Sequence, residues 1–349
     1  MRRHINIPIF VVHLGCPHQC SFCNQRTISG QACFDIEEMV RTVESCLATA
    51  GDAEVEIAFF GGSFTGIDRA LMTKILRRVQ PYLQSGRVSS LRCSTRPDYI
   101  NEEILDILEA YGMKTVELGI QSMSDKVLSA CHRGHTAEDS ERAARLLVSR
   151  GFSFVGQMMV GLPGSTAEDE IETAERIAAL GAVGARVYPT VVFRKTPLCL
   201  AAEEGRYTPL SLTEAVERAA SAVSVFRARD IPVIRVGLQA NEAMAEGSEI
   251  LGGPVHPALG ELVESALYRR RIEGALEKKS YGGQLLCLTV ARGATSAVIG
   301  QNKQNKIYLC RAYGFSAVTV TESAALCKGD IIIKTEKIEK TEERKRICT

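Results

Sequence analysis

The sequence predicts an α/β protein: a partial (β/α)6 TIM-like barrel followed by a small C-terminal α+β domain. Two observations lead to this fold class. Short β-rich runs alternate with longer amphipathic runs through the first 240 residues, and polar or glycine-rich motifs follow the β-rich runs. Such alternation implies parallel strands joined by right-handed crossovers. An open doubly wound sheet is also consistent with this pattern. The expected strands are 7–14, 55–60, 90–95, 115–120, 153–160 and 185–192.

The segments between these strands have the capping residues and apolar spacing of helices. Asp35 has Glu38 three residues later, and apolar residues then recur at helical spacing; Asp68 opens the next segment in the same way. Further helices are expected at 101–111, 137–150, 167–180 and 212–229. Because motifs that follow the strands of a barrel lie at one end of it, we expect a single shared site.

Composition is that of a globular protein, with 45% hydrophobic residues among 349 and no apolar run long enough to cross a membrane. We expect a barrel domain at 1–245, a basic α+β domain at 246–335 and a charged tail at 336–349. No small-residue cleavage site follows the apolar N-terminal stretch, so we expect a cytoplasmic protein with reduced thiols.

Charge is unevenly distributed along the chain. Residues 257–349 hold sixteen Lys and Arg against ten Asp and Glu, a net charge of +6, although the whole chain carries only +1. The difference leaves −5 for residues 1–256. This asymmetry favours an anionic partner for the C-terminal part, although chance variation of surface charge could also produce it.

The stretch GCPHQCSFCNQRTISG carries three of the twelve cysteines, at Cys16, Cys20 and Cys23. A tetrahedral zinc site needs a fourth ligand, for which His13 and His18 are near enough in sequence. Three thiolates on a four-iron cluster instead leave one iron open for a ligand from outside the protein. The spacing alone leaves both interpretations open. The other nine cysteines form no C-x-x-C pair, so a second cluster is not expected.

The cysteine motif is followed along the chain by GGSFTGI, VELGIQS, RGHT and MVGLPGS. In order and spacing these motifs resemble those of the radical SAM superfamily. STRPDYI and RVYPTVVFRKTPL add a similarity to its Elongator catalytic-subunit branch, in the short form without an acetyltransferase domain. The resemblance covers roughly residues 5–240.

This resemblance implies a set of cofactors and partners. The three cysteines would hold a [4Fe-4S] cluster, and S-adenosylmethionine would bind the open iron and be cleaved reductively to a 5′-deoxyadenosyl radical. The electron would come from an external donor of the flavodoxin or ferredoxin type. The Elongator-like motifs and the basic C-terminal part together point to tRNA as substrate.

The resemblance also implies which residues meet the cofactor. Gly61 and Gly62 would let the backbone approach the methionine amino group, Gln121 would face the ribose, and Arg133 would bind the carboxylate or ribose. Ser94 stands where many relatives carry Glu, which leaves Arg96 to pair with another carboxylate. The bland alternatives are a tight turn at the glycines and a solvated Arg133. The expected cofactor contacts are Gly61, Gly62, Ser63, Ser94, Gln121, Arg133 and Gln157.

A second group of residues is expected on the substrate side. Arg186 and Tyr188 end the sixth strand and Lys195 follows it, where an anionic substrate would enter; a solvated loop is the alternative. The C-terminal segment loosely resembles a KH core, but its loop, at residues 300–303, reads GQNK and lacks the second glycine of GXXG. The possible substrate contacts are Arg96, Arg186, Tyr188, Lys195, Lys303 and Lys306.

The sequence therefore predicts a radical SAM enzyme that modifies a tRNA base. One alternative is a radical SAM oxidase or decarboxylase of a small molecule such as a porphyrin precursor, because oxygen-independent coproporphyrinogen oxidases share the cysteine spacing. Another alternative is a zinc-stabilised RNA-binding protein without catalytic activity.

Overall fold

The computed structural model describes residues 3–11, 20–24, 34–238, 249–277 and 279–337. It divides into two compact units, Met1–Pro257 and Ala258–Thr349. The segment 250–252 belongs to the first unit, because its strand β9 (Ile250–Gly252) pairs with β7 (Val192–Phe193). Among the described residues, no helix is long and apolar enough to cross a membrane.

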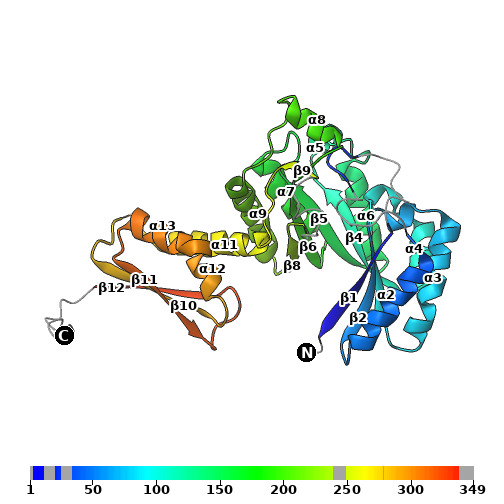
Figure 1. Ribbon diagram of the computed structural model, residues 1–349, viewed down its shortest axis with the longest axis horizontal. Coiled ribbons are helices and arrows are strands. Elements are labelled where there is room, and N and C mark those ends of the chain that lie inside the picture. Colours follow the sequence, from blue (N-terminus) through cyan, green and yellow to red (C-terminus); the bar gives the residue numbers. More distant parts are fainter. Residues whose placement is uncertain (1–2, 12–19, 25–33, 239–248, 278, 338–349) are drawn as a thin grey trace. The chain divides into compact units, whose positions relative to one another are not determined.

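The first unit is built on one seven-stranded parallel sheet, in the order β1-β2-β3-β4-β5-β6-β8. The sheet curls with helices along its outer side, as Figure 1 shows, and the predicted partial barrel is confirmed. Its strands are β1 (His4–Phe10), β2 (Glu54–Phe60), β3 (Ser90–Thr95), β4 (Met113–Gln121), β5 (Ser153–Val160), β6 (Gly184–Pro189) and β8 (Val233–Val236).

The sheet has one strand more than the six that the sequence predicts. β8 has only four residues and lies at the sheet edge, with Ile234 46% exposed. So short a strand with an exposed apolar residue has too little alternation to stand out. The predicted run 185–192 is divided, because β6 ends at Pro189 and a separate strand begins at Val192. Proline has no N–H to continue the ladder.

Helices of the first unit follow the predicted alternation. The carboxylates of Asp35 and Asp68 accept the backbone N–H of Glu38 and Leu71, which confirms both as N-caps. The helices are α2 (Ile36–Thr49), α3 (Arg69–Gln84), α4 (Glu102–Ala110), α5 (Asp125–Ala130), α6 (Ala137–Ser149), α7 (Ala167–Ala179), α8 (Pro197–Glu203) and α9 (Leu212–Arg227).

The two faces of the sheet differ in chemistry. A Cβ built on Gly156 would meet the side chain of Ile177 on α7, so Gly156 faces the helices and its neighbour Gln157 faces the inside. The helix-facing positions are apolar and buried, as at Ile57 and Leu118. The inward positions at the same level carry charge, as at Glu56 and Glu117. The barrel interior is therefore polar, and the apolar core lies between sheet and helices.

The second unit is a three-stranded sheet with helices packed against one face. The strand order is β11-β10-β12, with β10 and β11 parallel and β12 antiparallel to β10. Leu286, Leu288 and Val290 of β10 form the core together with Val298, Leu309 and other helix residues. The elements are α11 (Leu259–Ala275), β10 (Gln284–Ala291), α12 (Thr295–Ile299), α13 (Gln304–Tyr313), β11 (Ala317–Ser323) and β12 (Ile331–Lys337).

Candidate active site

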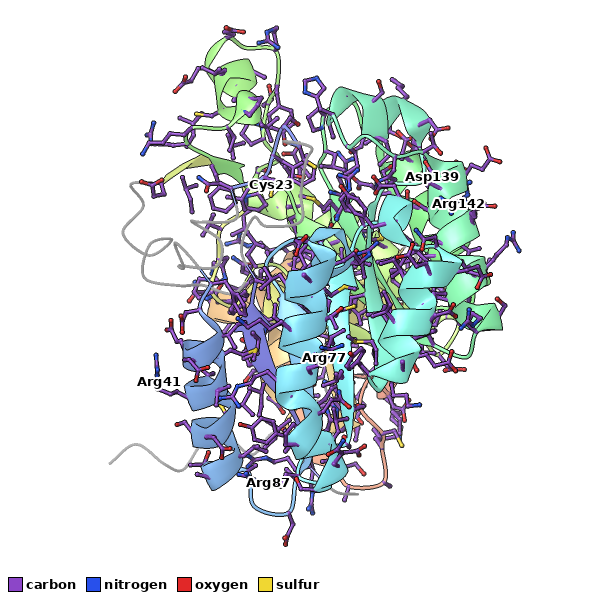
Figure 2. The ribbon with its side chains drawn as sticks, turned by 90° about the vertical axis from the view of Figure 1, so that its right-hand side faces the viewer. Cys23, Arg41, Arg77, Arg87, Asp139 and Arg142 are labelled. Carbon is purple, nitrogen blue, oxygen red and sulfur yellow. The ribbon has the colours of Figure 1, made fainter. Side chains whose placement is uncertain are left out.

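The segments that the sequence marks as functional follow the carboxyl ends of neighbouring strands. Gly61 and Gly62 follow β2, Arg96 follows β3, and Gln121 ends β4. Parallel strands bring these segments to one end of the sheet. Figure 2 shows Cys23 in the part of the first unit away from Arg87, which precedes β3. The predicted convergence of the strand-end motifs is thus present in the fold.

The part of the cysteine loop that is described, residues 20–24, is held by backbone hydrogen bonds. Ser21 N–H donates to the carbonyl of Cys131 at 2.9 Å, and Leu198 N–H donates to the carbonyl of Ser21 at 2.9 Å. Cys20 is 5% exposed and Cys23 is half-buried. Cys16, His13 and His18 lie outside the described residues. Within the described ranges, no group of three Cys, His, Asp or Glu side chains could hold a metal ion.

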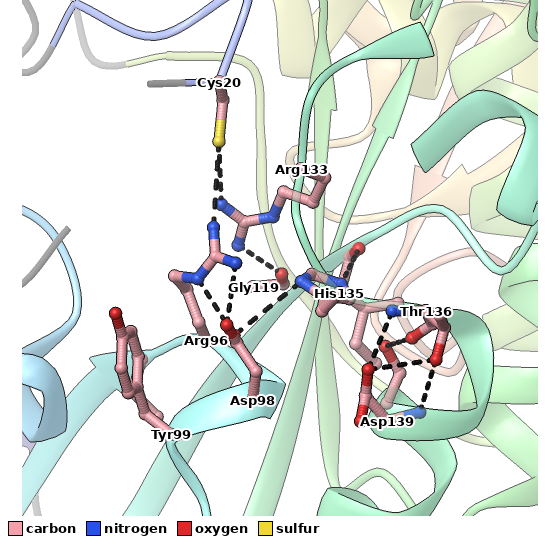
Figure 3. A network of polar contacts seen from close by, with 12 residues as sticks. Cys20, Arg96, Asp98, Tyr99, Gly119, Arg133, His135, Thr136 and Asp139 are labelled. Atoms are coloured by element: carbon pink, nitrogen blue, oxygen red, sulfur yellow. Dashed lines mark hydrogen bonds and ion pairs between the residues drawn. The ribbon is translucent and has the colours of Figure 1, made fainter. Parts of the chain in front are cut away.

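Two guanidinium groups reach the sulfur of Cys20, as Figure 3 shows. Nη1 of Arg133 lies 3.2 Å from Sγ, and Nη1 of Arg96 lies 4.0 Å from it. Nη2 of Arg133 donates to the carbonyl of Gly119 at 2.6 Å. Nε of Arg133 is buried without a hydrogen-bond partner among the described residues. One donor of an otherwise fixed guanidinium therefore remains to be satisfied.

Arg96 is paired with the carboxylate of Asp98, two residues along the STRPD motif. Its Nε and Nη2 donate to the two oxygens at 2.9 and 2.8 Å, a bidentate arrangement that fixes the guanidinium plane. The expectation that Arg96 finds a carboxylate partner is confirmed by this ion pair.

His135, from the RGHT motif, lies on the other side of Asp98 (Figure 3). Its Nε2 bonds to the carbonyl of Ile120 at 3.3 Å, so Nε2 carries the proton. Burial and the charges of Arg133 and Arg96 lower the pKa of His135 to about 3. The ring is therefore neutral near pH 7 and adds no charge beside the two arginines.

Two glycines at this end of the barrel lie too close to neighbouring protein atoms to be replaced by a larger residue. Gly61 has φ of +93°, and a Cβ there would lie 3.2 Å from the backbone nitrogen of Val11. A Cβ on Gly119 would lie 2.8 Å from Nη2 of Arg133 and 2.9 Å from Nε2 of Gln121. Gln121 itself has φ of +69° at a register shift of β4, the strained backbone that functional positions often adopt.

Ser63 and the pair Ser94 and Gln157 have different surroundings. Ser63 is buried at the turn after β2. Nε2 of Gln157 lies 3.4 Å from Oγ of Ser94 and donates to Oε2 of Glu117 at 2.8 Å. Glu117, which is opposite Ser94 in the register of β3 and β4, thus supplies a carboxylate beside it.

Glu117 is the centre of a charged network inside the barrel. Arg186 binds both its oxygens at 2.8 and 2.9 Å, and Arg92 bridges Glu117 at 2.9 Å to Glu56 at 2.6 Å. Burial alone would raise the pKa of Glu117, but the two arginines outweigh burial and hold it below its ordinary value. Arg186 is thus neutralised within the barrel, with its guanidinium over the ring of Phe60.

The remaining predicted substrate contacts lie on different elements of the chain. Tyr188 is half-buried and follows Arg186 on the inward face of β6, whereas Lys195 is exposed on the loop before α8. Lys303 and Lys306 belong to the second unit.

Several polar residues of the site escape prediction from sequence. Asp98 and His135 lie in motifs that the sequence marks, but their partnership is visible only in space. Glu170 on α7 accepts the N–H of Gly161 at 2.6 Å and pairs with Arg218, which holds the GLPGS loop in place. The sequence signal for Glu170 is a glutamate within the amphipathic pattern of this helix, and only the structure shows that it is buried.

The fold and these strand-end loops define a class of protein, and comparison with known families names it. Residues 10–177 match the radical SAM superfamily, and residues 182–269 match the Radical SAM C-terminal domain. The chain belongs to the radical SAM superfamily and is an enzyme of that class.

Within the superfamily the chain is similar to Elongator proteins. It is 30% identical over 209 residues to human Elongator complex protein 3, covering 52% of this chain and 38% of that protein. It is 29% identical over 192 residues to the tRNA uridine(34) acetyltransferase of Methanocaldococcus jannaschii, covering 49% of this chain and 36% of that enzyme. An uncharacterised protein of the same archaeon is 30% identical over 212 residues, 57% of this chain and 65% of that one.

A solved structure shares the fold. The archaeal Elp3 of Methanocaldococcus infernus, with an N-terminal deletion, superposes with a TM-score of 0.62 at 22% identity, covering 78% of this chain and 64% of that one. The matches thus span from about one third to two thirds of the length of these relatives.

Proposed function

We propose that this enzyme binds a four-iron cluster through Cys16, Cys20 and Cys23 and modifies a tRNA base. When bound, the cluster supplies the electron that cleaves S-adenosylmethionine reductively to the radical that starts the chemistry. The observation that carries the proposal is the convergence of Arg133 and Arg96 on Cys20 at the carboxyl end of the sheet.

The residues present fit such a cofactor pair. Two buried cations suit an anionic thiolate cluster, since their charge offsets that of the sulfur ligands. The unpartnered Nε–H of Arg133 offers a donor for the carboxylate or a ribose hydroxyl of S-adenosylmethionine. Gly61 lets the turn after β2 pack closely against the backbone of Val11, and Gly119 leaves the space that the guanidinium of Arg133 occupies. Gln121, in its strained conformation, is our candidate for the ribose contact.

An RNA substrate is supported by the relatives, among them a tRNA uridine(34) acetyltransferase and Elongator complex protein 3. The second unit adds a structural argument. Its order of β10, α12, a loop, α13 and β11, with β10 and β11 parallel, agrees with the loose KH resemblance.

The GQNK loop joins α12 to α13 and carries Lys303 at the position of the missing second glycine. Lys303 has φ of +61°, in the left-handed region that glycine favours, so the backbone takes the conformation that glycine would allow. The side chains of Gln301, Asn302 and Lys303 are exposed there. The loop therefore presents donors and a positive charge suited to a nucleic-acid backbone.

Nucleosides of total tRNA test the proposed function. In a strain that lacks this enzyme, we expect one modified nucleoside to disappear and its unmodified precursor to accumulate. The wild-type gene should restore the modification, and a Cys20→Ala gene should not, because the site would then lack one of its three cluster ligands. An unchanged nucleoside profile would reject the tRNA substrate and would favour the small-molecule alternative.

Binding of tRNA to the GQNK loop makes a second prediction. The double variant Lys303→Glu and Lys306→Glu should bind tRNA at least tenfold more weakly at low salt, because two cations become two anions. The slope of log affinity against log salt should flatten by about 0.7 to 0.9 for each phosphate that the variant no longer neutralises. Fluorescence anisotropy across a potassium chloride series measures both quantities.

The matched control is Lys334→Glu with Lys337→Glu, two exposed lysines of the same unit on β12. It makes the same change in net charge away from the loop. Equal affinities and slopes for the two double variants would show that the GQNK loop has no special part in binding.

A further inference from the structure

The buried cysteine Cys20 has two positively charged side chains next to its sulfur. Its sulfur is contacted by guanidinium groups from two different loops, one after β3 and one after α5 (Figure 3). Arg96 is 2% exposed and Arg133 is 8% exposed. Burying two cations costs free energy unless they have charged or hydrogen-bonding partners. Such an arrangement therefore calls for an explanation in terms of the sulfur that they face.

Both guanidinium groups are fixed in orientation. Arg96 is held by the two oxygens of Asp98 and lies over the ring of Tyr99, with 5.9 Å between its Cζ and the ring centroid. Arg133 is held by the carbonyl of Gly119. Neither arginine needs to reorganise in order to donate to the sulfur, so the electrostatic field at Cys20 is built into the fold.

The local charges do not cancel. Among the residues that the structure describes here, two arginines face the carboxylate of Asp98, while His135 is neutral. A net positive charge therefore lies beside the Cys20 sulfur.

We propose that Arg96 and Arg133 are positioning residues that raise the reduction potential of the cluster by donating to the Cys20 thiolate, and that Asp98 limits this effect. The inference rests on the proposed function. Reduction adds one electron from an external low-potential donor and one negative charge to the cluster, and nearby cations and hydrogen-bond donors stabilise that charge. The arginines therefore make the cluster easier to reduce.

The test is a redox titration of the anaerobically reconstituted full chain, followed by electron paramagnetic resonance without S-adenosylmethionine. Arg133→Gln and Arg96→Gln should each lower the ratio of reduced to oxidised cluster about tenfold at a fixed potential, which is about 59 mV for one electron. Asp98→Asn keeps the side-chain shape but removes the compensating charge, so its potential should rise.

The opposite signs of the expected shifts in reduction potential distinguish an effect of charge from an effect of loosened structure. If Arg96→Gln and Asp98→Asn shift the potential in the same direction, general disorder around the loop explains the shift and the inference is wrong. Arg133→Lys keeps the charge and should retain about half of the effect. Arg176→Gln is the matched control, because it removes an arginine whose guanidinium bonds to Met123 and Glu141 instead of facing the Cys20 sulfur.

The iron content of each sample distinguishes this inference from the proposed function. A wild-type protein that assembles no cluster would reject both. A wild-type cluster whose potential equals that of Arg133→Gln, Arg96→Gln and Asp98→Asn would reject only the inference. If Arg133→Gln holds too little iron to titrate, the signs of the potential shifts in Arg96→Gln and Asp98→Asn decide whether the inference holds.

Discussion

Replacement of Cys20 by Ala should abolish iron incorporation and the formation of 5′-deoxyadenosine while the protein still folds. Both losses should be complete, because the two remaining thiolates do not hold a four-iron cluster with a single open iron, which the chemistry needs. Folding should survive, since the segment is anchored by backbone bonds of Ser21 to Cys131 and Leu198. Removing one buried sulfur should cost about 1 kcal/mol of unfolding free energy. Cys16→Ala and Cys23→Ala should behave in the same way.

Cys131→Ala is the matched control for this series. Cys131 is also buried next to the loop, but it stands outside the three-cysteine motif. This variant should keep its iron, its visible charge-transfer absorption and its cleavage activity. Persistent 5′-deoxyadenosine formation in all three other variants would contradict the cluster assignment. A colourless wild-type protein with stoichiometric zinc would support the zinc alternative instead.

Replacement of Glu117 by Gln should produce the largest loss of stability in the barrel. Glu117 is fully buried and is the shared partner of Arg186 and Arg92, so its neutralisation leaves buried guanidinium charge uncompensated. Breaking a buried ion pair from one side costs about 3–5 kcal/mol. Denaturant unfolding of the apoprotein at pH 7 measures the loss.

Glu103→Gln is the matched control, because Glu103 is 73% exposed and lies 3.6 Å from Arg69. Its effect should stay below about 1 kcal/mol. Equal losses for the two variants would mean that the interior network does not stabilise the fold.

The effect of Glu117 should also depend on pH with a defined sign. Its pKa in the folded protein is lower than the ordinary value of 4.5. The stability that its charge provides is therefore complete above pH 4.5 and is lost as the pH falls through the folded pKa. The difference between wild type and Glu117→Gln should shrink on acidification, and a difference that grew would contradict the network.

This network also changes the interpretation of Arg186. From its place at the end of a strand, the sequence suggests a cation for an anionic substrate. The structure gives that cation an internal partner 69 residues away in sequence. Lys195 remains exposed at the loop before α8 and stays a candidate for substrate contact. Tyr188, beside Arg186 on the same strand, remains a proposed contact as well.

Much of the fold could be predicted because its signals are local. The N-caps at Asp35 and Asp68 follow from side chains that bond to the next turn of backbone. The six predicted strands are visible as short β-rich runs that alternate with amphipathic helical segments. β8 was missed because an edge strand of four residues has little such pattern.

The candidate site divides along the same line. The sequence by itself determined the cysteine spacing, the glycine turns and the order of the strand-end motifs, because each depends on residues within a few positions of one another. Only the tertiary structure decided that Arg96 and Arg133, 76 and 113 residues from Cys20, meet at its sulfur. It also decided that the carboxylate of Glu117 compensates the charge of Arg186 in an ion pair. Charges far apart in sequence become partners only when neighbouring strands bring them together, and in a low-dielectric interior those partnerships set both pKa and stability.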